Sequence, residues 1–244
     1  MTTAGALAKA IADAGIKKAF GLPGGEVLVL IDELRKAGVD FVLMRHEANA
    51  GIAAAVYGKL QRQPGVVIAT LGPGAANLLL PVSSAYLDQE PLLAITAQIP
   101  DEFPSSHTHQ LLPLHDMYRP ICKVVEKVTS SNVSEAAGRA LSACMDRPYG
   151  VSYLTLSARE AIQPVPANGR RWHDAPPTRP MTNPAAKAAD LRSRCATAER
   201  PLVLIGLGVR PERAVKLRRW LDEWQLPFAV TCGSGTRSSS CKWP

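Results

Sequence analysis

Hydrophobic residues follow two different spacings along the first 160 or so residues of the chain. Apolar positions three and four residues apart, such as Leu7, Ala10, Ile11 and Ala14, predict helices. Short apolar runs rich in β-branched residues predict buried strands between these helices. We expect helices over 3–14, 26–38, 47–63, 78–89 and 136–147, and strands over 17–22, 39–44, 65–71, 91–97 and 150–157. This alternation predicts parallel βαβ units, and therefore an α/β fold with an open parallel sheet flanked by helices.

The pattern changes after this first domain, to which we assign residues 1–162. Residues 163–184 hold six prolines and no periodicity, so we expect a linker over 163–182. Helical and strand-like patterns then alternate twice over 183–231, which predicts the start of a second α/β domain, a partial central domain. The tail over 232–244 has no apolar periodicity and is atypical of either domain.

Composition and charge exclude several classes of function. The formal net charge is +7, but the basic residues are dispersed and lack interleaved aromatic residues, which favours a solvated surface over a nucleic-acid partner. No apolar run approaches the ~20 residues that cross a bilayer, and the N-terminus lacks the layout of a signal peptide. We therefore expect no membrane partner. The five cysteines form no CxxC pair, which predicts reduced thiols and a cytoplasmic location.

Glu47 is the first candidate functional residue. It follows the apolar run "FVLM" almost directly and precedes a helix rich in small residues. Ligands of open parallel sheets bind outside the carboxyl ends of the strands, which is where this carboxylate should lie. Alternatively, Glu47 has only a structural role, because a negative charge near a helix N-terminus stabilises the helix.

Two turns rich in glycine and proline should lie at the same sheet edge. "GLPGG" at 21–25 and "TLGPGAAN" at 70–77 each follow a predicted strand and precede a helix. The second turn has Asn77 where a dinucleotide fingerprint needs its third glycine, and no Lys-Ser/Thr pair follows as in a phosphate-binding P-loop. Either turn alone could be a tight βα connection, but together with Glu47 they predict the rim of one pocket.

Three of the five histidines, His107, His109 and His115, fall within the stretch 105–116. No well-placed carboxylate or cysteine supports them as metal ligands, so we expect no metal site in this chain. A polar loop at the edge of an active site, carrying Gln110, is the preferred interpretation.

Five segments in order carry a resemblance to a known family. They are "FGLPGGEVLVLIDEL", "FVLMRHEANAGIAAAVYGKL", "GVVIATLGPGAANLL", "AYLDQEPLLAITAQIP" and "THQLLPLHDMYRPICKVVEKV". Together they resemble the N-terminal, pyrimidine-binding domain of thiamine-diphosphate-dependent enzymes, and most closely the acetolactate synthase group. The resemblance covers residues 3–162, and 183–231 resemble the first part of that family's central domain.

The resemblance implies a cofactor and specific roles for these residues. The glutamate matching Glu47 contacts N1′ of the aminopyrimidine ring of thiamine diphosphate and favours the imino tautomer, which activates the cofactor towards a 2-oxo acid substrate. Gln110 matches a glutamine that faces the reaction centre, so the expected catalytic residues are Glu47 and Gln110. The expected cofactor-binding residues are Leu22, Pro23, Gly24, Glu47, Thr70, Pro73 and Asn77. The helix after Glu47 should pack at an interface between chains, because this family builds its site in a homodimer or tetramer.

The sequence also departs from the family pattern. The family binds Mg²⁺ and the diphosphate through a Gly-Asp-Gly motif in a C-terminal domain, and this chain contains no such motif. We therefore expect that the chain alone neither binds the cofactor tightly nor catalyses the reaction. The loss of the apolar pattern after residue 231 is typical of a frameshift or a premature stop. FAD binding stays open, because the family's central domain is cut short here.

Three interpretations remain at this point. The chain is the N-terminal part of an acetolactate synthase-like carboligase or decarboxylase acting on 2-oxo acids. Alternatively, it is one subunit of a split decarboxylase whose partner supplies a separate diphosphate-binding subunit. The third interpretation is a non-catalytic binding module.

Overall fold

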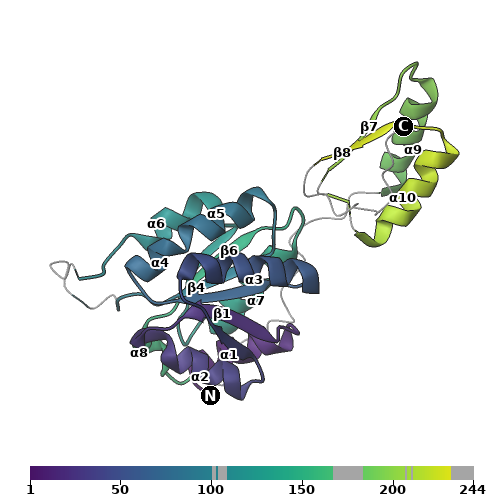
Figure 1. The fold of residues 1–244 in the computed structure, drawn as a ribbon. Coiled ribbons are helices and arrows are strands. Elements are labelled where there is room, and N and C mark those ends of the chain that lie inside the picture. The colour runs from purple at the N-terminus through teal and green to yellow at the C-terminus, as the bar shows by residue number, and fades with distance from the viewer. Residues whose placement is uncertain (101–102, 104–108, 167–183, 207, 210, 232–244) are drawn as a thin grey trace. The chain divides into compact units, whose positions relative to one another are not determined.

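The chain forms two compact units in a computed structural model, residues 1–178 and 179–244. The structure describes residues 1–100, 103, 109–166, 184–206, 208–209 and 211–231 (Figure 1). Most of the predicted linker over 163–182, and all of the tail over 232–244, lie outside these residues. The domain boundaries set from the sequence stay predictions.

The first unit is built on a six-stranded parallel sheet with the strand order β2-β1-β3-β4-β6-β5. Its strands are β1 (Lys18–Leu22), β2 (Asp40–Leu43), β3 (Gly65–Ala69), β4 (Leu92–Thr96), β5 (Val124–Lys127) and β6 (Val151–Thr155). Every neighbouring pair of strands is parallel. The predicted α/β fold with a parallel sheet is therefore confirmed.

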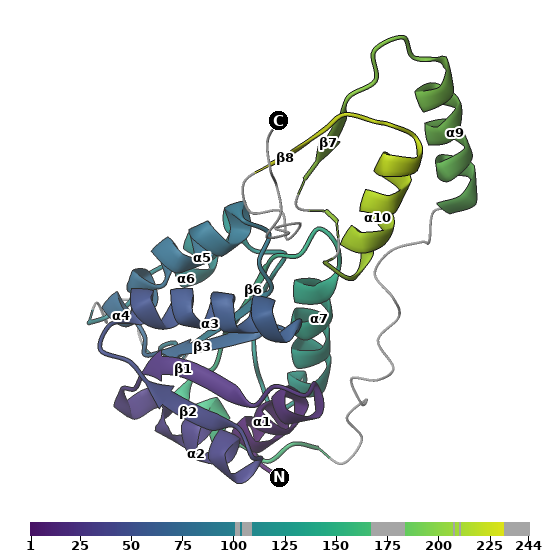
Figure 2. The same ribbon diagram turned by 45° about the vertical axis from the view of Figure 1, so that its right-hand side comes forward.

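Helices cover both faces of this sheet (Figures 1 and 2). One face carries α1 (Thr3–Asp13), α2 (Leu28–Lys36), α7 (Val133–Met145) and α8 (Ala158–Ala161). The other carries α3 (Glu47–Gln61), α4 (Pro73–Asn77), α5 (Leu79–Leu87) and α6 (Leu114–Tyr118). Two short 3₁₀ turns, η1 (Gly25–Val27) and η2 (Arg119–Ile121), precede α2 and follow α6.

Alternation along the central strands creates two separate cores. In β3, Val66 and Ile68 are buried under α1, α2 and α7, whereas Val67 and Ala69 are buried under α3 and its neighbours. Strands buried on both faces read as continuous apolar runs, which is why the sequence predicted them so clearly.

Small residues let α3 approach the sheet closely. A Cβ added to Gly65 in β3 would overlap the Ala54 carbonyl oxygen of α3, and one added to Gly58 would overlap the Gly65 backbone nitrogen. This packing fixes α3 above β3, and with it the residue at the start of the helix.

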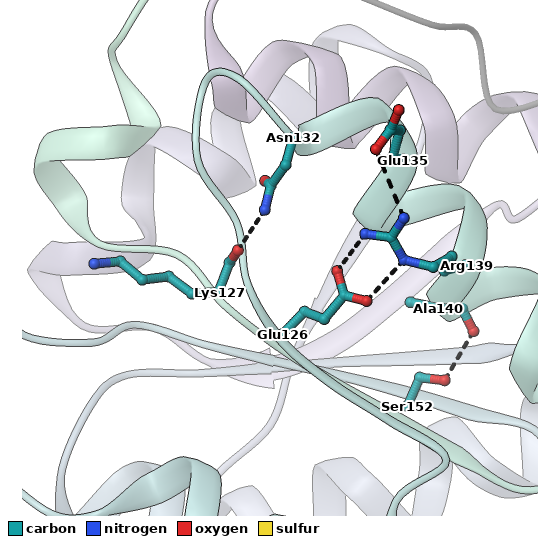
Figure 3. Close-up of polar contacts among 7 residues, drawn as sticks. All are labelled: Glu126, Lys127, Asn132, Glu135, Arg139, Ala140 and Ser152. Carbon is teal, nitrogen blue, oxygen red and sulfur yellow. Dashed lines mark hydrogen bonds and ion pairs between the residues drawn. The ribbon is translucent and has the colours of Figure 1, made fainter.

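Strand β5 was not predicted from the sequence. It has four residues, all of intermediate burial, because it lies at the edge of the sheet. Glu126 on this strand accepts two hydrogen bonds from Arg139 of α7, both at 2.8 Å, which ties the edge to the helix (Figure 3). Nearby, the Ser152 hydroxyl of β6 donates to the Ala140 carbonyl at 2.8 Å.

The second unit contains α9 (Pro184–Thr197), β7 (Val203–Ile205), α10 (Pro211–Glu223) and β8 (Phe228–Val230). Its two strands are parallel, as the sequence predicted for the start of a second α/β domain. Three buried residues, Ile205, Leu221 and Leu226, form its core. Across both units, none of the helices described is long and apolar enough to span a bilayer.

Candidate active site at the carboxyl edge of the sheet

The carboxyl ends of three neighbouring strands bring the predicted site residues together. Gly24 follows β1, Glu47 opens α3 after β2, and Thr70 follows β3. Because β1 lies between β2 and β3, the loops after these strands are adjacent in space. The three turns predicted to share an edge do so.

Glu47 is a buried carboxylate that accepts a hydrogen bond from a side chain of α4. Only 6% of the residue is exposed. Asn77, at the end of α4, donates from Nδ2 to Glu47 Oε2 at 3.0 Å. His46 caps the helix, because its Nδ1 accepts the Ala48 backbone N–H at 3.1 Å. Glu47 is therefore held in place at the first turn of α3 by both its backbone and its side chain.

The second carboxylate oxygen of Glu47 faces a glycine. A Cβ added to Gly74 would lie 3.2 Å from Glu47 Oε1 and 2.7 Å from Thr70 Cγ2. Any residue other than glycine would thus intrude on the space beside Oε1. Glycine at 74 therefore lets the backbone of α4 lie close to the Glu47 carboxylate and to Thr70.

Glu26 belongs to this cluster and was missed from the sequence. Thr70 donates its hydroxyl to Glu26 Oε2 at 2.6 Å, and a Cβ added to Gly24 would lie 2.7 Å from Thr70 Oγ1. The short distance is that of a charge-assisted hydrogen bond. Glu26 follows the "PGG" turn directly, and this position at a strand end was the available signal.

Gln110 lies against the turn after β3. Gly72 has a φ of 58°, and a Cβ there would lie 2.7 Å from the Gln110 Cβ. A positive φ favours glycine, so the sequence "GPG" is required by both conformation and space. Gln110 itself has a φ of 57° and is exposed.

The remaining predicted cofactor residues lie on the strand end and the turns that carry this cluster. Leu22 ends β1 opposite Ala69 of β3, Pro23 is exposed after it, and Pro73 is the exposed first residue of α4. Their roles stay predictions.

Two stacked tyrosines pack beneath the backbone of α4, on the side that faces the sheet. The Tyr118 hydroxyl donates to the Ala75 carbonyl of α4 at 2.6 Å, and its ring stacks on Tyr153 with centroids 3.7 Å apart. The Tyr153 hydroxyl lies 2.6 Å from Thr96 Oγ1. Burial raises the pKa of both phenols above the usual value. A neutral, fully packed stack therefore fixes the helix that carries Asn77.

Two of the three histidines of the stretch 105–116 lie within the residues described. His107 lies outside the residues described, and His109 is exposed. His115 Nε2 lies 2.9 Å from Thr155 Oγ1 at the end of β6. Within the described part of the chain, no three His, Cys, Asp or Glu side chains are grouped so that they could hold a metal ion.

Comparison with known proteins agrees with this geometry. Residues 1–117 match the family described as "Thiamine pyrophosphate enzyme, N-terminal TPP binding domain". The chain is 30% identical over 223 residues to the acetolactate synthase of Bacillus subtilis, covering 91% of this chain and 39% of that protein. It is 31% identical over 220 residues to the large subunit of acetolactate synthase isozyme 2 of Escherichia coli, covering 89% and 39%. It is 30% identical over 238 residues to a 2-hydroxyacyl-CoA lyase of rice, Oryza sativa subsp. japonica, covering 91% and 41%.

The chain spans about two fifths of the length of the curated relatives it matches. The matched family covers the part of the sheet that carries Glu47, Thr70 and Asn77. Residues 1–117 therefore match the N-terminal TPP-binding domain of thiamine pyrophosphate enzymes, and the chain is similar in sequence to acetolactate synthases over most of its length.

Proposed function

We propose that this chain binds the aminopyrimidine half of thiamine diphosphate, as part of an enzyme that joins or decarboxylates 2-oxo acids. The observation that carries the proposal is the Glu47 carboxylate, which is buried, accepts a hydrogen bond from Asn77 on Oε2, and lies close to the backbone of Gly74 on its Oε1 side. The names of the relatives support a carboligase of the acetolactate synthase type.

The residues present fit the cofactor's pyrimidine ring. Glycine at 24 and 74 lets the backbone of both turns lie close against Thr70, so the turns that would border a flat ring are packed tightly together. A weakly basic ring nitrogen needs a carboxylate in a site that excludes water, which the burial of Glu47 provides. When bound, thiamine diphosphate supplies the carbon nucleophile that attacks the 2-oxo group.

Each residue of the cluster then has a separate task. Glu47 holds the proton shared with the ring nitrogen at Oε1, and Asn77 orients the carboxylate through Oε2. Thr70 is fixed by Glu26 and forms one wall of the space. Gln110, beside Gly72, is the residue that would contact the substrate.

The rest of the cofactor is bound elsewhere. Since the relatives are about two and a half times as long as the part matched here, we place the diphosphate and Mg²⁺ on further sequence or on a separate subunit. Accordingly, this chain alone binds the cofactor weakly and does not turn over.

A second chain is proposed as the partner of α3 and α5. These helices pack side by side on one face of the sheet (Figures 1 and 2). On α3, Ile52, Val56 and Leu60 are 46%, 45% and 73% exposed, spaced four residues apart on one side of the helix. Leu80 and Leu87 of α5 are exposed as well. Exposed apolar residues on both helices support a homodimer or tetramer.

The test is a titration of the purified chain with thiamine, which carries the pyrimidine but no diphosphate. We expect weak, saturable shifts of the Glu47 and Asn77 amide signals by NMR, and loss of saturation in Glu47→Gln. Glu90→Gln is the matched control, because Glu90 is a half-buried carboxylate that pairs with Lys59 at the other end of α3. Equal binding by the wild type and Glu47→Gln would disprove the proposed role.

A further inference from the structure

Gln98 has a buried side-chain oxygen to which none of the described residues donates a hydrogen bond. The residue as a whole is half-buried, but its Oε1 is closed off from solvent. Almost all buried polar groups of folded proteins have a partner, and a buried group without one costs free energy. Exceptions of this kind are expected at functional sites, where a sequence gives up some stability. Gln98 is therefore a candidate for a further residue of the site.

The alternation of side chains along β4 directs Gln98 towards the face of the sheet that carries the site. Ala97 is buried in the core under α1, α2 and α7, and Ile99 packs against the same core. Because successive side chains of an extended chain point to opposite faces, Gln98 points to the face covered by α3, α4, α5 and α6. Thr96, two residues earlier, faces the same side, since its hydroxyl lies 2.6 Å from the Tyr153 hydroxyl.

Gln98 also neighbours the turn after β3. Strand β4 lies next to β3 in the middle of the sheet (Figure 1), and the Ala97 N–H donates to the Ala69 carbonyl at 3.2 Å. This bond places Gln98 beside the chain that leaves β3 towards Gly72. A Cβ added to Gly72 would lie 2.9 Å from the Gln110 carbonyl oxygen. Gln98 and Gln110, the residue proposed to contact the substrate, therefore neighbour the same turn.

The chemistry of the amide oxygen limits the ligands that it can hold, because this atom only accepts hydrogen bonds. A 2-oxo acid at neutral pH offers only acceptors, in its keto and carboxylate oxygens. When two such acids are joined, one loses carbon dioxide and its keto carbon forms a bond to the keto carbon of the other. The oxygen of this second keto group takes up a proton and becomes a hydroxyl group, which can donate.

We infer that Gln98 Oε1 accepts a hydrogen bond from the hydroxyl group of a 2-hydroxy acid, the class of product that joining two 2-oxo acids yields. A hydroxyl group that reaches this oxygen gains a bond without displacing one made by a described residue. The site should therefore hold a 2-hydroxy acid more tightly than an acid of the same shape that lacks the hydroxyl group. The inference rests on the proposed function, which supplies the class of substrate.

The experiment is an NMR titration of the full chain with 2-hydroxyisobutyrate and, separately, with pivalate at constant ionic strength. The two acids have the same charge and nearly the same shape, but pivalate has a methyl group in place of the hydroxyl group. We expect 2-hydroxyisobutyrate to shift the Gly72 amide signal and to bind about three- to tenfold more tightly than pivalate, the range for one neutral hydrogen bond.

Gln98→Met keeps a side chain of similar size but removes the acceptor, so it should abolish the difference between the two acids. Gln61→Met is the matched control and should keep the difference, because Gln61 is exposed at the C-terminal end of α3. Thermal unfolding gives a second readout, which a purely structural role would move in the other direction. Removing a buried oxygen without a donor should raise the melting temperature of the unliganded chain, whereas removing an existing hydrogen bond would lower it.

Four results would each overturn the inference. They are a lower melting temperature in Gln98→Met, no saturable shift with 2-hydroxyisobutyrate, equal binding of the two acids by the wild type, and a difference that survives in Gln98→Met. Thiamine separates this inference from the proposed function. If thiamine binds and Glu47→Gln abolishes its binding, any of the four results removes only the role of Gln98. If thiamine does not bind, the proposed function fails, whereas a difference between the acids that depends on Gln98 would still support the contact with a hydroxyl group.

Discussion

Replacing Gly74 by alanine should weaken thiamine binding much more than it lowers the stability of the chain. The added methyl group would lie 2.7 Å from Thr70 Cγ2, although carbon atoms pack at about 3.5–4.0 Å, so one of the two groups must move by about 1 Å. Thr70 resists this movement, because its χ1 angle is restricted and its hydroxyl is held by Glu26 at 2.6 Å.

The expected loss of stability is small because two effects oppose each other. Overpacking a filled site costs about 1–3 kcal/mol. Gly74 lies inside α4, where alanine is better than glycine by up to about 1 kcal/mol. The net loss of unfolding free energy should be about 1 kcal/mol, measured by urea denaturation and circular dichroism.

The expected loss of thiamine binding is larger. The methyl group would also lie 3.2 Å from Glu47 Oε1, so it would push the carboxylate away from the position in which it is proposed to meet the pyrimidine ring. Binding measured by NMR titration should fall more than about tenfold, beyond what 1 kcal/mol of instability would cause. Gly25→Ala is the control, because a Cβ there meets no atom within 4 Å. If Gly74→Ala bound thiamine as well as Gly25→Ala does, the proposed position of the ring would be refuted.

Three further predictions concern the framework of the site. Gly65→Ala should destabilise the first unit by about 3 kcal/mol or more in urea, because its Cβ overlaps the backbone of α3; a loss below 1 kcal/mol would contradict this. Arg139→Ala should cost only about 0.5–1 kcal/mol, since its ion pair with Glu126 is partly exposed, and the difference should shrink in about 1 M NaCl. Burial raises the pKa of the Cys144 thiol from 9.0 to about 11. The stabilisation is complete below pH 9 and is lost as the pH rises to 11, so the melting temperature should fall less steeply over that range in Cys144→Ala than in the wild type.

The arrangement of strands could be predicted from the sequence because the central strands are buried on both faces. Runs such as "GVVIA" contain no polar residue to obscure them, and β1 and β3 each end in a glycine-rich turn. Their common direction follows from the helices between them. It follows that Glu47, Thr70 and Asn77 meet at one edge, as the structure shows.

Contacts that depend on side-chain direction could not be predicted in this way. Asn77 and Glu47 are 30 residues apart, and nothing in the local pattern specifies their hydrogen bond. Glu26 was overlooked because it was assigned to an amphipathic helix, whereas residues 25–27 form a 3₁₀ turn that directs its carboxylate to Thr70. The edge strand β5 has only four residues, and all of them are of intermediate burial, so its sequence shows no distinct apolar pattern.

The stacked tyrosines under α4 have a spectroscopic consequence. All five tyrosines of the chain belong to the first unit, and the two tryptophans that the structure describes, Trp220 and Trp224, belong to the second. In a Trp172→Phe background, tryptophan emission would follow the second unit, and the ultraviolet absorbance of ionised phenol would follow the release of the Tyr118–Tyr153 stack. One sample titrated with alkali would thus yield two unfolding curves, and their separation would measure how independently the two units unfold.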